Sequence, residues 1–552
     1  MEENTVEESS KNVIVVGSGS AGFLAALAAK EAGLDPIILE STGRLGGSSA
    51  MSGGGAWIPN NPLMLRAGVK DSYEDARKYM DITIGEVGPA SSPERRDTYL
   101  REGPKMVAWL ESLGMRLHYG KGYADYYPEL PGGTPIGRLV EPEPFDLKKL
   151  GDWKDKINIS ISIPVYTLDG VKIALSMRSF SAFLHTANVI GIRTLGNLLI
   201  GKKLAGIGGA LIGQLTYLAL QRSIPIWLNA TMVELIHENG EVKGVIVEKD
   251  GQRIELRGKA VILTAGGFPH NNEMRQQYHP HPITTNWTVA HKGNLGAAIK
   301  AGIEIGAATA LMDDAWWGPC FIDSKGTSQF MIWERSFPYS IIVDKSGKRF
   351  MNESASYVDC GHWQYERNKE VPAIPAYLVF DQHHHKYYPL GVGLPGAEPK
   401  EYFESGMLTK AETLADLAAK IGVDPKGLEE TVVRFNQFAL NGKDEDFHRG
   451  DSAYDRVYSD PKVTPNPNLA PLTKPPFYAV KVWPGDLGTK GGLLTDEHAR
   501  VLREDGTIIK GLYAAGNSSA SVMGHTYPGP GSTIGPAMVF GMMAGRHAAT
   551  LE

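Results

Sequence analysis

A glycine-rich turn near the start of the chain limits what this region can fold into. A buried strand is predicted before the turn, at residues 13–16, and a packed helix after it, at residues 20–32. The turn itself has G-x-G-x-x-G spacing, from Gly17 through Gly19 to Gly22, which lets the backbone approach a pyrophosphate at the helix N-terminus. Glu40 ends the next apolar run, where a carboxylate can accept hydrogen bonds from a ribose. The segment therefore predicts a dinucleotide site.

Three further segments favour FAD over NAD as the dinucleotide. Residues 41–57 form a loop of glycines and small hydroxyl side chains, for which a nicotinamide enzyme has no standard need. Two later apolar strands end in glycine turns, at residues 259–268 and 511–517. Ordinary turns could explain any one of these segments, but they explain the set poorly. Together the segments resemble the flavoprotein family that includes the flavoprotein subunits of fumarate reductase and succinate dehydrogenase.

This resemblance implies FAD as the cofactor, and the absence of a histidine from the early glycine-serine loop favours non-covalent binding. Met232 lies where the family places a backbone contact to the adenine. The candidate FAD-binding residues are Gly17, Gly19, Ser20, Ala21, Gly22, Glu40, Ser41, Gly46, Gly47, Ser48, Ser49, Ser52, Gly53, Gly54, Met232, Ala265, Gly266, Gly267, Gly516, Asn517, Thr533 and Ile534.

The length of 552 residues exceeds what one core usually organises, so more than one domain is expected. The resemblance implies an α/β fold, in which a Rossmann-like FAD-binding domain is built from both chain ends and an α+β catalytic cap domain is inserted between them. We expect the FAD-binding domain at 1–315 and 486–552, and the cap at 316–485. Alternation around two turns predicts an antiparallel meander at 226–264, and two helices are expected in the cap, at 410–422 and 427–440.

The loop GHTYPGPGSTIGPAM, residues 524–538, carries one tyrosine among glycines and prolines. Fumarate reductases place a dicarboxylate-binding arginine near this point, whereas this chain has Tyr527. A neutral phenol cannot bind a dianion strongly, but it can donate a hydrogen bond to a ketone. The loop closely resembles the C-terminal signature of 3-ketosteroid Δ1-dehydrogenases. Similar likenesses extend over nearly the whole chain, at 52–62, 122–133, 340–357, 380–382, 434–450 and 485–493.

The second resemblance implies a reaction and its residues. Forming a C1–C2 double bond beside a 3-ketone requires loss of a proton from C2 and of a hydride from C1. In the family, a loop tyrosine and a backbone N–H polarise the ketone, and these map onto Tyr527 and Gly531. The family's base maps onto Tyr357, assisted by Tyr126. Tyr123 and Tyr127 are alternatives to Tyr126, and any one of the 22 tyrosines taken alone is more often a half-buried aromatic residue.

Two other functions are considered. One is the related Δ4-(5α)-dehydrogenation of 3-ketosteroids, which the Tyr-Pro-Gly-x-Gly loop disfavours. The other is a fumarate-reductase-like electron-transfer subunit that binds partner proteins, which the missing arginine disfavours. The electron acceptor of the steroid enzyme is expected to be artificial in assays, or a quinone if the protein lies on a membrane. His525 could orient the loop of Tyr527 or simply pack there.

Net charge, cysteine content and histidine spacing indicate which partners, cell compartment and metal sites to expect. The net charge of −6, without a basic stripe, gives no reason to expect nucleic acid. Cys320 and Cys360 form no C-x-x-C pair, and residues 1–12 lack a signal peptide, so a cytoplasmic location is expected. Histidines at 279–281 and 383–385 do not have the spacing of a metal site, and none is predicted.

Residues 180–220 are largely apolar, but Arg193, Lys202 and Lys203 interrupt every window long enough to span a bilayer. A transmembrane helix is therefore not expected. The segment could instead rest in the interface of the inner face of the cell membrane, where a sterol-like substrate dissolves, or pack on the FAD-binding domain.

Overall fold

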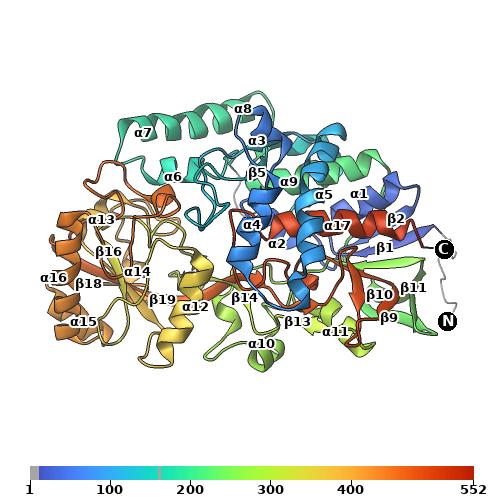
Figure 1. Ribbon diagram of the computed structural model, residues 1–552. Helices are drawn as coiled ribbons and strands as arrows, with labels where there is room; N and C mark the ends of the chain where they lie inside the picture. Colours follow the sequence, from blue (N-terminus) through green and yellow to red (C-terminus); the bar gives the residue numbers. More distant parts are fainter. Residues whose placement is uncertain (1–10, 160–162, 552) are drawn as a thin grey trace.

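The computed structural model describes residues 11–159 and 163–551, so most of the segment examined for a signal peptide, residues 1–10, lies outside it. Two sheets organise the chain, and Figure 1 shows them in separate lobes, with helix α12 (Tyr357–Asn368) between the two. Their strands confirm the α/β class.

Among the described residues, the larger sheet has nine strands. Its parallel part takes strands from both ends of the chain in the order β22-β12-β1-β2-β8, namely β22 (Ile508–Ala514), β12 (Ala260–Leu263), β1 (Asn12–Val16), β2 (Asp35–Leu39) and β8 (Ile226–Trp227). The predicted meander is confirmed as the antiparallel strands β9 (Ala230–Glu238), β10 (Glu241–Lys249) and β11 (Gln252–Arg257). β21 (Arg500–Leu502) pairs with β22.

Helix α1 (Ser20–Glu31) packs closely on the C-terminal helix α17 (Ile534–Ala548). Glycines make the approach possible, because a Cβ at Gly541 would lie 2.3 Å from the Ala21 carbonyl oxygen and one at Gly545 would lie 2.2 Å from that of Ala25. The contact fixes the start of α17, and with it the loop of Tyr527, against the N-terminal part of the chain.

The smaller sheet has six antiparallel strands in the described residues, β14 (Ala315–Ile322), β15 (Ser328–Phe330), β16 (Ser340–Val343), β17 (Ala376–Phe380), β18 (Leu408–Ala411) and β19 (Phe477–Thr489). β14 and β19 pair from Ala315↔Thr489 to Cys320↔Trp483, at both predicted limits of the cap. The domain limits themselves stay a prediction.

The two helices expected in the cap are present as α15 (Leu414–Ile421) and α16 (Pro425–Asn441). Thr413 and Asp424 accept hydrogen bonds from the first turns, at 3.1 and 3.0 Å, and so start the two helices. Gly422 and Gly442 end them in the left-handed conformation. Apolar side chains of both helices pack on β16 and β17 and form the core of this lobe.

The apolar segment 180–220 divides into two parts. Helix α9 (Ile207–Gln221) is almost wholly buried against the larger lobe. Before it, α7 (Phe180–Ala187), η3 (Asn188–Gly196) and α8 (Asn197–Leu199) lie on the outside of the molecule, along the top of Figure 1. No helix in the described part of the chain combines the length and the apolar character needed to cross a membrane.

The remaining elements connect these layers. They are α2 (Gly47–Met51), β3 (Ala56–Trp57), α3 (Pro62–Arg66), α4 (Tyr73–Ile84), η1 (Pro89–Ser91), α5 (Pro93–Ser112), β4 (Leu117–Tyr119), β5 (Leu139–Pro142), β6 (Phe145–Asp146), η2 (Leu147–Trp153), α6 (Asp169–Ala174), β7 (Leu204–Ala205), α10 (Asn272–Tyr278), η4 (Thr285–Trp287), α11 (Ala297–Glu304), β13 (Thr309–Ala310), α13 (Gln382–Tyr387), α14 (Lys400–Glu404), η5 (Asp455–Tyr458), β20 (Gly492–Leu493) and η6 (Gly516–Ser518).

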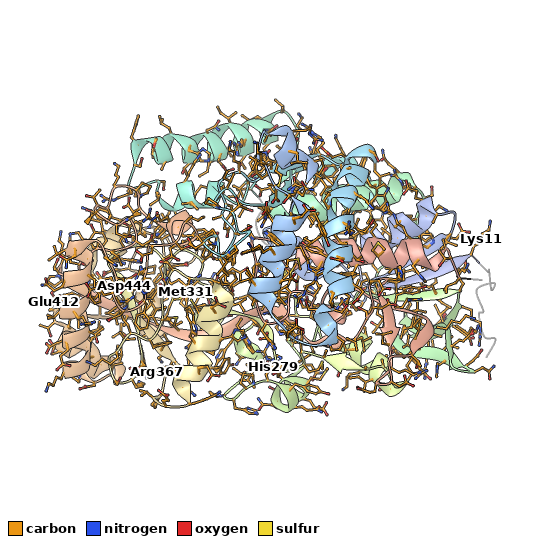
Figure 2. All side chains as sticks on the ribbon, in the orientation of Figure 1. Lys11, His279, Met331, Arg367, Glu412 and Asp444 are labelled. Atoms are coloured by element: carbon orange, nitrogen blue, oxygen red, sulfur yellow. The ribbon has the colours of Figure 1, made fainter. Side chains whose placement is uncertain are left out.

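His279, labelled in Figure 2, is buried against Phe268 and Trp317, and neither ring nitrogen has a hydrogen-bond partner within the described residues. Burial lowers the pKa of His279 to about 3. Because the unfolded chain takes up this proton near pH 6.5, we expect stability to fall as the pH drops from about 6.5 towards 3, by up to about 1.4 kcal/mol per pH unit from this group.

Urea unfolding of the FAD-saturated protein at pH 7.5 and 5.0 measures this effect. His279→Leu should reduce the stability difference between the two pH values, whereas His237→Leu, at an exposed position of β9, should leave it unchanged. Equal pH dependence in wild type and His279→Leu would contradict the assignment.

Candidate active site

The turn between β1 and α1 forms a close backbone cradle. Gly17 has φ of +108°, and a Cβ there would lie 2.5 Å from the Thr264 carbonyl oxygen, while a Cβ at Gly22 would lie 2.0 Å from the Gly17 carbonyl oxygen. Gly19, the residue before the helix, has no side chain to cap the first turn, and the Ser20 N–H donates to the Ser49 hydroxyl oxygen at 3.2 Å. The first N–H groups of α1 are therefore oriented as a phosphate-binding site requires.

Glu40 lies buried just after the carboxyl end of β2. Its carboxylate accepts hydrogen bonds from the Thr42 N–H at 2.9 Å and the Thr42 hydroxyl at 2.8 Å, and from the Ser18 hydroxyl. The Ser18 oxygen in turn accepts from the Gly46 N–H, at 3.0 Å. These contacts hold an acceptor at the sheet edge, where a ribose of a dinucleotide would lie. The next residue, Ser41, is exposed.

The glycine-serine loop is fixed by its hydroxyl groups. Gly46 and Gly47 have positive φ and begin α2. Ser48 accepts from the His291 N–H and the Asn294 amide, both at 2.9 Å, and Ser49 accepts from the Ser20 N–H at 3.2 Å. Farther along, Ser52 accepts from the Gly54 N–H beside Gly53. The sequence did not indicate the contribution of residues 291–294.

The other predicted cofactor residues gather at neighbouring strand ends. β1, β12 and β22 are adjacent and parallel, so the turns at Ala265–Gly267 and Gly516–Asn517 lie at the same sheet edge as Gly17. The Ser518 hydroxyl joins them by donating to the Gly266 carbonyl, at 3.0 Å. Thr533 and Ile534 begin α17, again without a side-chain cap, whereas Met232 is buried in β9. A cradle that admits only glycine, a buried acceptor and two helix starts whose N-cap residues make no side-chain cap bond fit FAD.

Three of the predicted catalytic residues, Tyr126, Tyr357 and Tyr527, meet in one buried cluster. Their ring centroids are 5.4 Å apart for Tyr126 and Tyr357, 5.0 Å for Tyr126 and Tyr527, and 4.9 Å for Tyr357 and Tyr527. Tyr357 is the first residue of α12, and Tyr126 is held to the final loop by its N–H, which donates to the Pro528 carbonyl at 2.9 Å. Residues 401 positions apart in the chain thus form one site.

The fourth predicted residue, Gly531, lies in a close backbone contact. Its φ is +94°, and a Cβ there would lie 2.4 Å from the Gly55 carbonyl oxygen. Its own carbonyl accepts from the Trp57 N–H at 3.2 Å. Ser532 stiffens the same loop by exchanging hydrogen bonds with the backbone of Gly529, at 2.7 and 3.0 Å. The loop is held from both sides, so its N–H groups have fixed directions.

Burial governs the acidity of the cluster. It raises the pKa of Tyr357 and of Tyr126 well above the usual value. For Tyr357, the Tyr126 hydroxyl opposes this rise. Burial also raises the pKa of Tyr527, while the Tyr357 and Thr533 hydroxyls and the Gly531 N–H oppose the rise. The Gly531 N–H thus favours the ionised form of Tyr527.

The neighbouring tyrosines and His525 have other partners. The Tyr123 hydroxyl is 2.6 Å from that of Tyr458, and Tyr127 donates to Asp359 at 3.1 Å. Of the three tyrosines considered as the assistant of Tyr357, Tyr126 is therefore the one whose ring contacts both Tyr357 and Tyr527. His525 Nδ1 lies 2.9 Å from the Asp314 carboxylate, which favours orientation of the loop over simple packing.

Sequence reasoning missed several residues around the cluster. Tyr454 stacks on Tyr126 with 4.1 Å between ring centroids, and Arg335 is fully buried beside these rings. Asp125 accepts from the Trp57 indole at 2.7 Å and pairs with Arg138. Asp125 lies inside the GYADYYP segment and could have been found there. The other residues are distant in sequence and carry no motif.

The histidines set aside as metal ligands have other contacts. His384 on α13 lies 3.1 Å from the Glu334 carbonyl oxygen, and His383 contacts Asp381. In the parts of the chain that the structure describes, no group of three or more His, Cys, Asp or Glu side chains has the arrangement of a metal site. Cys320 and Cys360 are buried and free.

Comparison with known proteins gives the class first. The family model described as FAD binding domain matches residues 12–534, so the chain is a flavoprotein of this class. A 3-oxosteroid 1-dehydrogenase of Mycobacterium tuberculosis is 47% identical and the match covers 98% of each chain. The chain therefore belongs to the family of FAD-dependent 3-oxosteroid 1-dehydrogenases, and the predicted resemblance is confirmed.

Solved structures agree with this placement. The 3-ketosteroid Δ1-dehydrogenase of Sterolibacterium denitrificans, in complex with 1,4-androstadiene-3,17-dione, is 38% identical, with a TM-score of 0.92 over 98% of this chain and 100% of that chain. The 3-ketosteroid-Δ4-(5α)-dehydrogenase of Rhodococcus jostii RHA1 is 20% identical, with a TM-score of 0.68 over 100% of this chain and 98% of that chain, and shows the fold alone.

The cradle can be tested by substitution. Gly17→Ala should yield protein that loses most of its flavin during purification, because the new methyl group contacts the Thr264 backbone. Gly33→Ala is the matched control: its φ is also positive, at +83°, but nothing lies within 4 Å of its Cβ position. The flavin-to-protein absorbance ratio measures the effect, and equal ratios for the two variants would contradict the assignment.

Proposed function

We propose that this protein introduces a C1–C2 double bond into 3-ketosteroids, converting 3-oxo-Δ4-steroids into 3-oxo-Δ1,4-dienes. One observation carries the proposal: Tyr126, Tyr357 and Tyr527 meet in a buried cluster at the glycine loop of Gly531. These groups are neutral donors and one potential base, as an uncharged ketone requires. The membership of the 3-oxosteroid 1-dehydrogenase family supports the same reaction.

The Tyr527 hydroxyl and the Gly531 N–H polarise the C3 carbonyl. Both groups belong to the same loop, and the Gly531 N–H lowers the pKa of the Tyr527 hydroxyl. Their role is to donate to the oxygen on which negative charge develops as C2 loses its proton. Two preorganised donors in a buried place act as an oxyanion hole, and the loss of one typically costs about 3 kcal/mol of barrier.

Tyr357 removes the C2 proton, and Tyr126 assists it. A phenol with an ordinary pKa near 10 is mostly protonated at neutral pH, and burial makes ionisation harder. A hydrogen bond donated by the Tyr126 hydroxyl stabilises the phenolate of Tyr357. Water has little access to either ring, so the base is not competing with solvent.

FAD, bound without a covalent link, supplies a two-electron acceptor for the hydride that leaves C1. Gly17, Gly22 and the first turn of α1 would hold its pyrophosphate, Glu40 a ribose, and the start of α17 the region near the reacting ring. The electrons then pass to an external acceptor, for which we propose a quinone.

The alternatives have less support. The Δ4-(5α)-dehydrogenase likeness stands at 20% identity and carries fold only. A dicarboxylate-reducing subunit would need a cation in the final loop, where this chain has Tyr527. Anaerobic mixing with androst-4-ene-3,17-dione, a 5α-saturated ketone or fumarate separates the three, because flavin bleaching with a 1,4-diene product occurs only for the first function.

Tyr527→Phe tests the carbonyl contact. We expect kcat to fall about 100-fold with androst-4-ene-3,17-dione, since one donor of the oxyanion hole is lost, while bound flavin stays at the wild-type level. Tyr387→Phe, on α13 away from the cluster, should retain wild-type kcat. Stopped-flow reduction of the flavin measures the step, and an unchanged rate in Tyr527→Phe would exclude this residue as the donor.

We further propose that α7, η3 and α8 rest on the surface of a membrane. Exposed apolar side chains are concentrated there, and Leu199 is 88% exposed. They are Met177, Phe180, Phe183, Leu184, Ile190, Ile192, Leu195, Leu198, Leu199 and Ile200. Exposed Lys202 and Lys203 follow directly, as suits an anionic lipid surface. A sterol-like substrate is dissolved in the same phase.

Sedimentation with anionic liposomes tests this surface. Wild type should pellet with the vesicles, and the double variant Leu198→Glu with Leu199→Glu should remain in the supernatant. Val433→Glu with Leu440→Glu is the control, since both residues are exposed on α16, which lies on the side of the other lobe (Figure 1). If wild type stays in the supernatant, the membrane proposal is wrong.

A further inference from the structure

Arg335 is completely buried between β15 and β16, close to the tyrosine cluster. Its guanidinium donates to three backbone carbonyls, Nε to Met331 at 3.1 Å and Nη1 to Ala355 at 2.9 Å and to Glu353, and Nη1 also lies 3.5 Å from the Cys360 sulfur. Met331 is labelled in Figure 2, to the left of the centre of the molecule. Nη2 has no hydrogen-bond partner within the described residues.

This arginine differs from most buried arginines of the chain, because no carboxylate in the described residues forms an ion pair with it. Arg138 pairs with Asp71 and Asp125, and Arg275 pairs with Asp486. A buried cation without a counter-charge is costly, so its retention calls for negative charge nearby at some stage of the protein's work.

The carboxylates in range of Arg335 accept hydrogen bonds from other groups, although Glu334 Oε2 has no hydrogen-bond partner within the described residues. Asp455 accepts from the Asn352 amide, Glu334 from the Gly391 N–H and Asp359 from the Tyr127 hydroxyl. The other titratable groups facing Arg335 are Cys360, 3.5 Å from Nη1, and the cluster residues Tyr454 and Tyr126. Burial raises the pKa of Cys360 to about 12 and also raises the pKa values of Tyr454 and Tyr126, so each of these groups gains from the cation when it ionises.

Those tyrosines connect Arg335 to the reacting base. Tyr454 stacks on Tyr126 at 4.1 Å, and Tyr126 meets the ring of Tyr357 edge-on at 5.4 Å. The Tyr123 hydroxyl, 3.4 Å from that of Tyr126, extends the chain of hydroxyls to Tyr458. Burial raises the pKa of Tyr458 to about 12, and the Arg335 charge opposes the rise.

We propose that Arg335 is a positioning residue whose charge stabilises the phenolate shared by Tyr357 and Tyr126. It acts in two ways, by its field across Tyr454 and by its hydrogen bonds to Glu353 and Ala355, which fix the chain just before α12. The inference rests on the proposed function. In the step it serves, the C2–H bond breaks, the proton passes to the phenolate oxygen of Tyr357, and the electron pair moves towards the C3 oxygen.

The pH profile of kcat/KM with androst-4-ene-3,17-dione and an artificial acceptor tests this role. Arg335→Met should move the ascending limb, which reports ionisation of the base, to higher pH by about one unit, and so lower kcat/KM about tenfold below the limb. Arg335→Lys, which retains the charge, should leave the limb near its wild-type position. Arg95→Met is the control, since Arg95 is also buried, donates to backbone carbonyls and has no carboxylate partner in the described residues.

Three outcomes would overturn the inference: an unmoved limb in Arg335→Met, an equal shift in Arg335→Lys, or an equal shift in Arg95→Met. A lower rate at every pH without a shift would assign Arg335 to structural support alone. If Arg335→Met does not retain flavin, Arg335→Gln replaces it, because its amide can still donate to Ala355. The position of the ascending limb in its pH profile of kcat/KM is then the measurement. Failure of wild type to form the 1,4-diene would instead reject the proposed function.

Discussion

The close contact between α1 and α17 is the constraint on which the rest of the structure depends. Glycines at 541 and 545 let the last helix approach the backbone of the first. This single contact links the two parts of the candidate site. Helix α1 begins at the glycine turn of Gly17, and α17 begins three residues after Gly531. It sets the distance between the cofactor-binding edge of the sheet and the loop of Tyr527, although the two lie at opposite ends of the chain.

Burial has opposite effects on the two halves of the site. It strengthens the hydrogen bonds that Tyr527 and Gly531 can give, because a donor in a water-poor place has no competing solvent. The same burial disfavours the phenolate that the proposed role of Tyr357 requires. A site of neutral phenols therefore requires positive charge at some distance, close enough to help the base but not placed where it would bind an anion. Arg335, one ring beyond Tyr126, satisfies both conditions.

Local sequence patterns were enough to predict much of the fold and part of the candidate site. The strands, glycine turns and cap helices follow from periodicity and end signals that lie within a few residues, such as Thr413 and Gly422 around α15. The tyrosine cluster was reachable through motif resemblance. Arg335 and Asp314 could not be predicted from the sequence, because their partners are distant in the chain. A single arginine or aspartate also matches no sequence motif. Nor could composition separate buried α9 from exposed α7 and α8, since all three are apolar and only the packing differs.

The charges around the cluster explain how a shared fold serves a neutral substrate. Binding a dicarboxylate takes cations free to approach it, whereas two buried cations near this cluster already contact other groups. Arg335 donates to backbone carbonyls, and Lys490 lies 3.2 Å from the Asp314 carboxylate and over the ring of Trp316. A dianion entering the site would meet phenols and backbone donors only, which cannot repay the loss of its hydration. A ketone loses little hydration and needs only the donors that the final loop presents, so the chemistry follows from where the charges are held rather than from the fold.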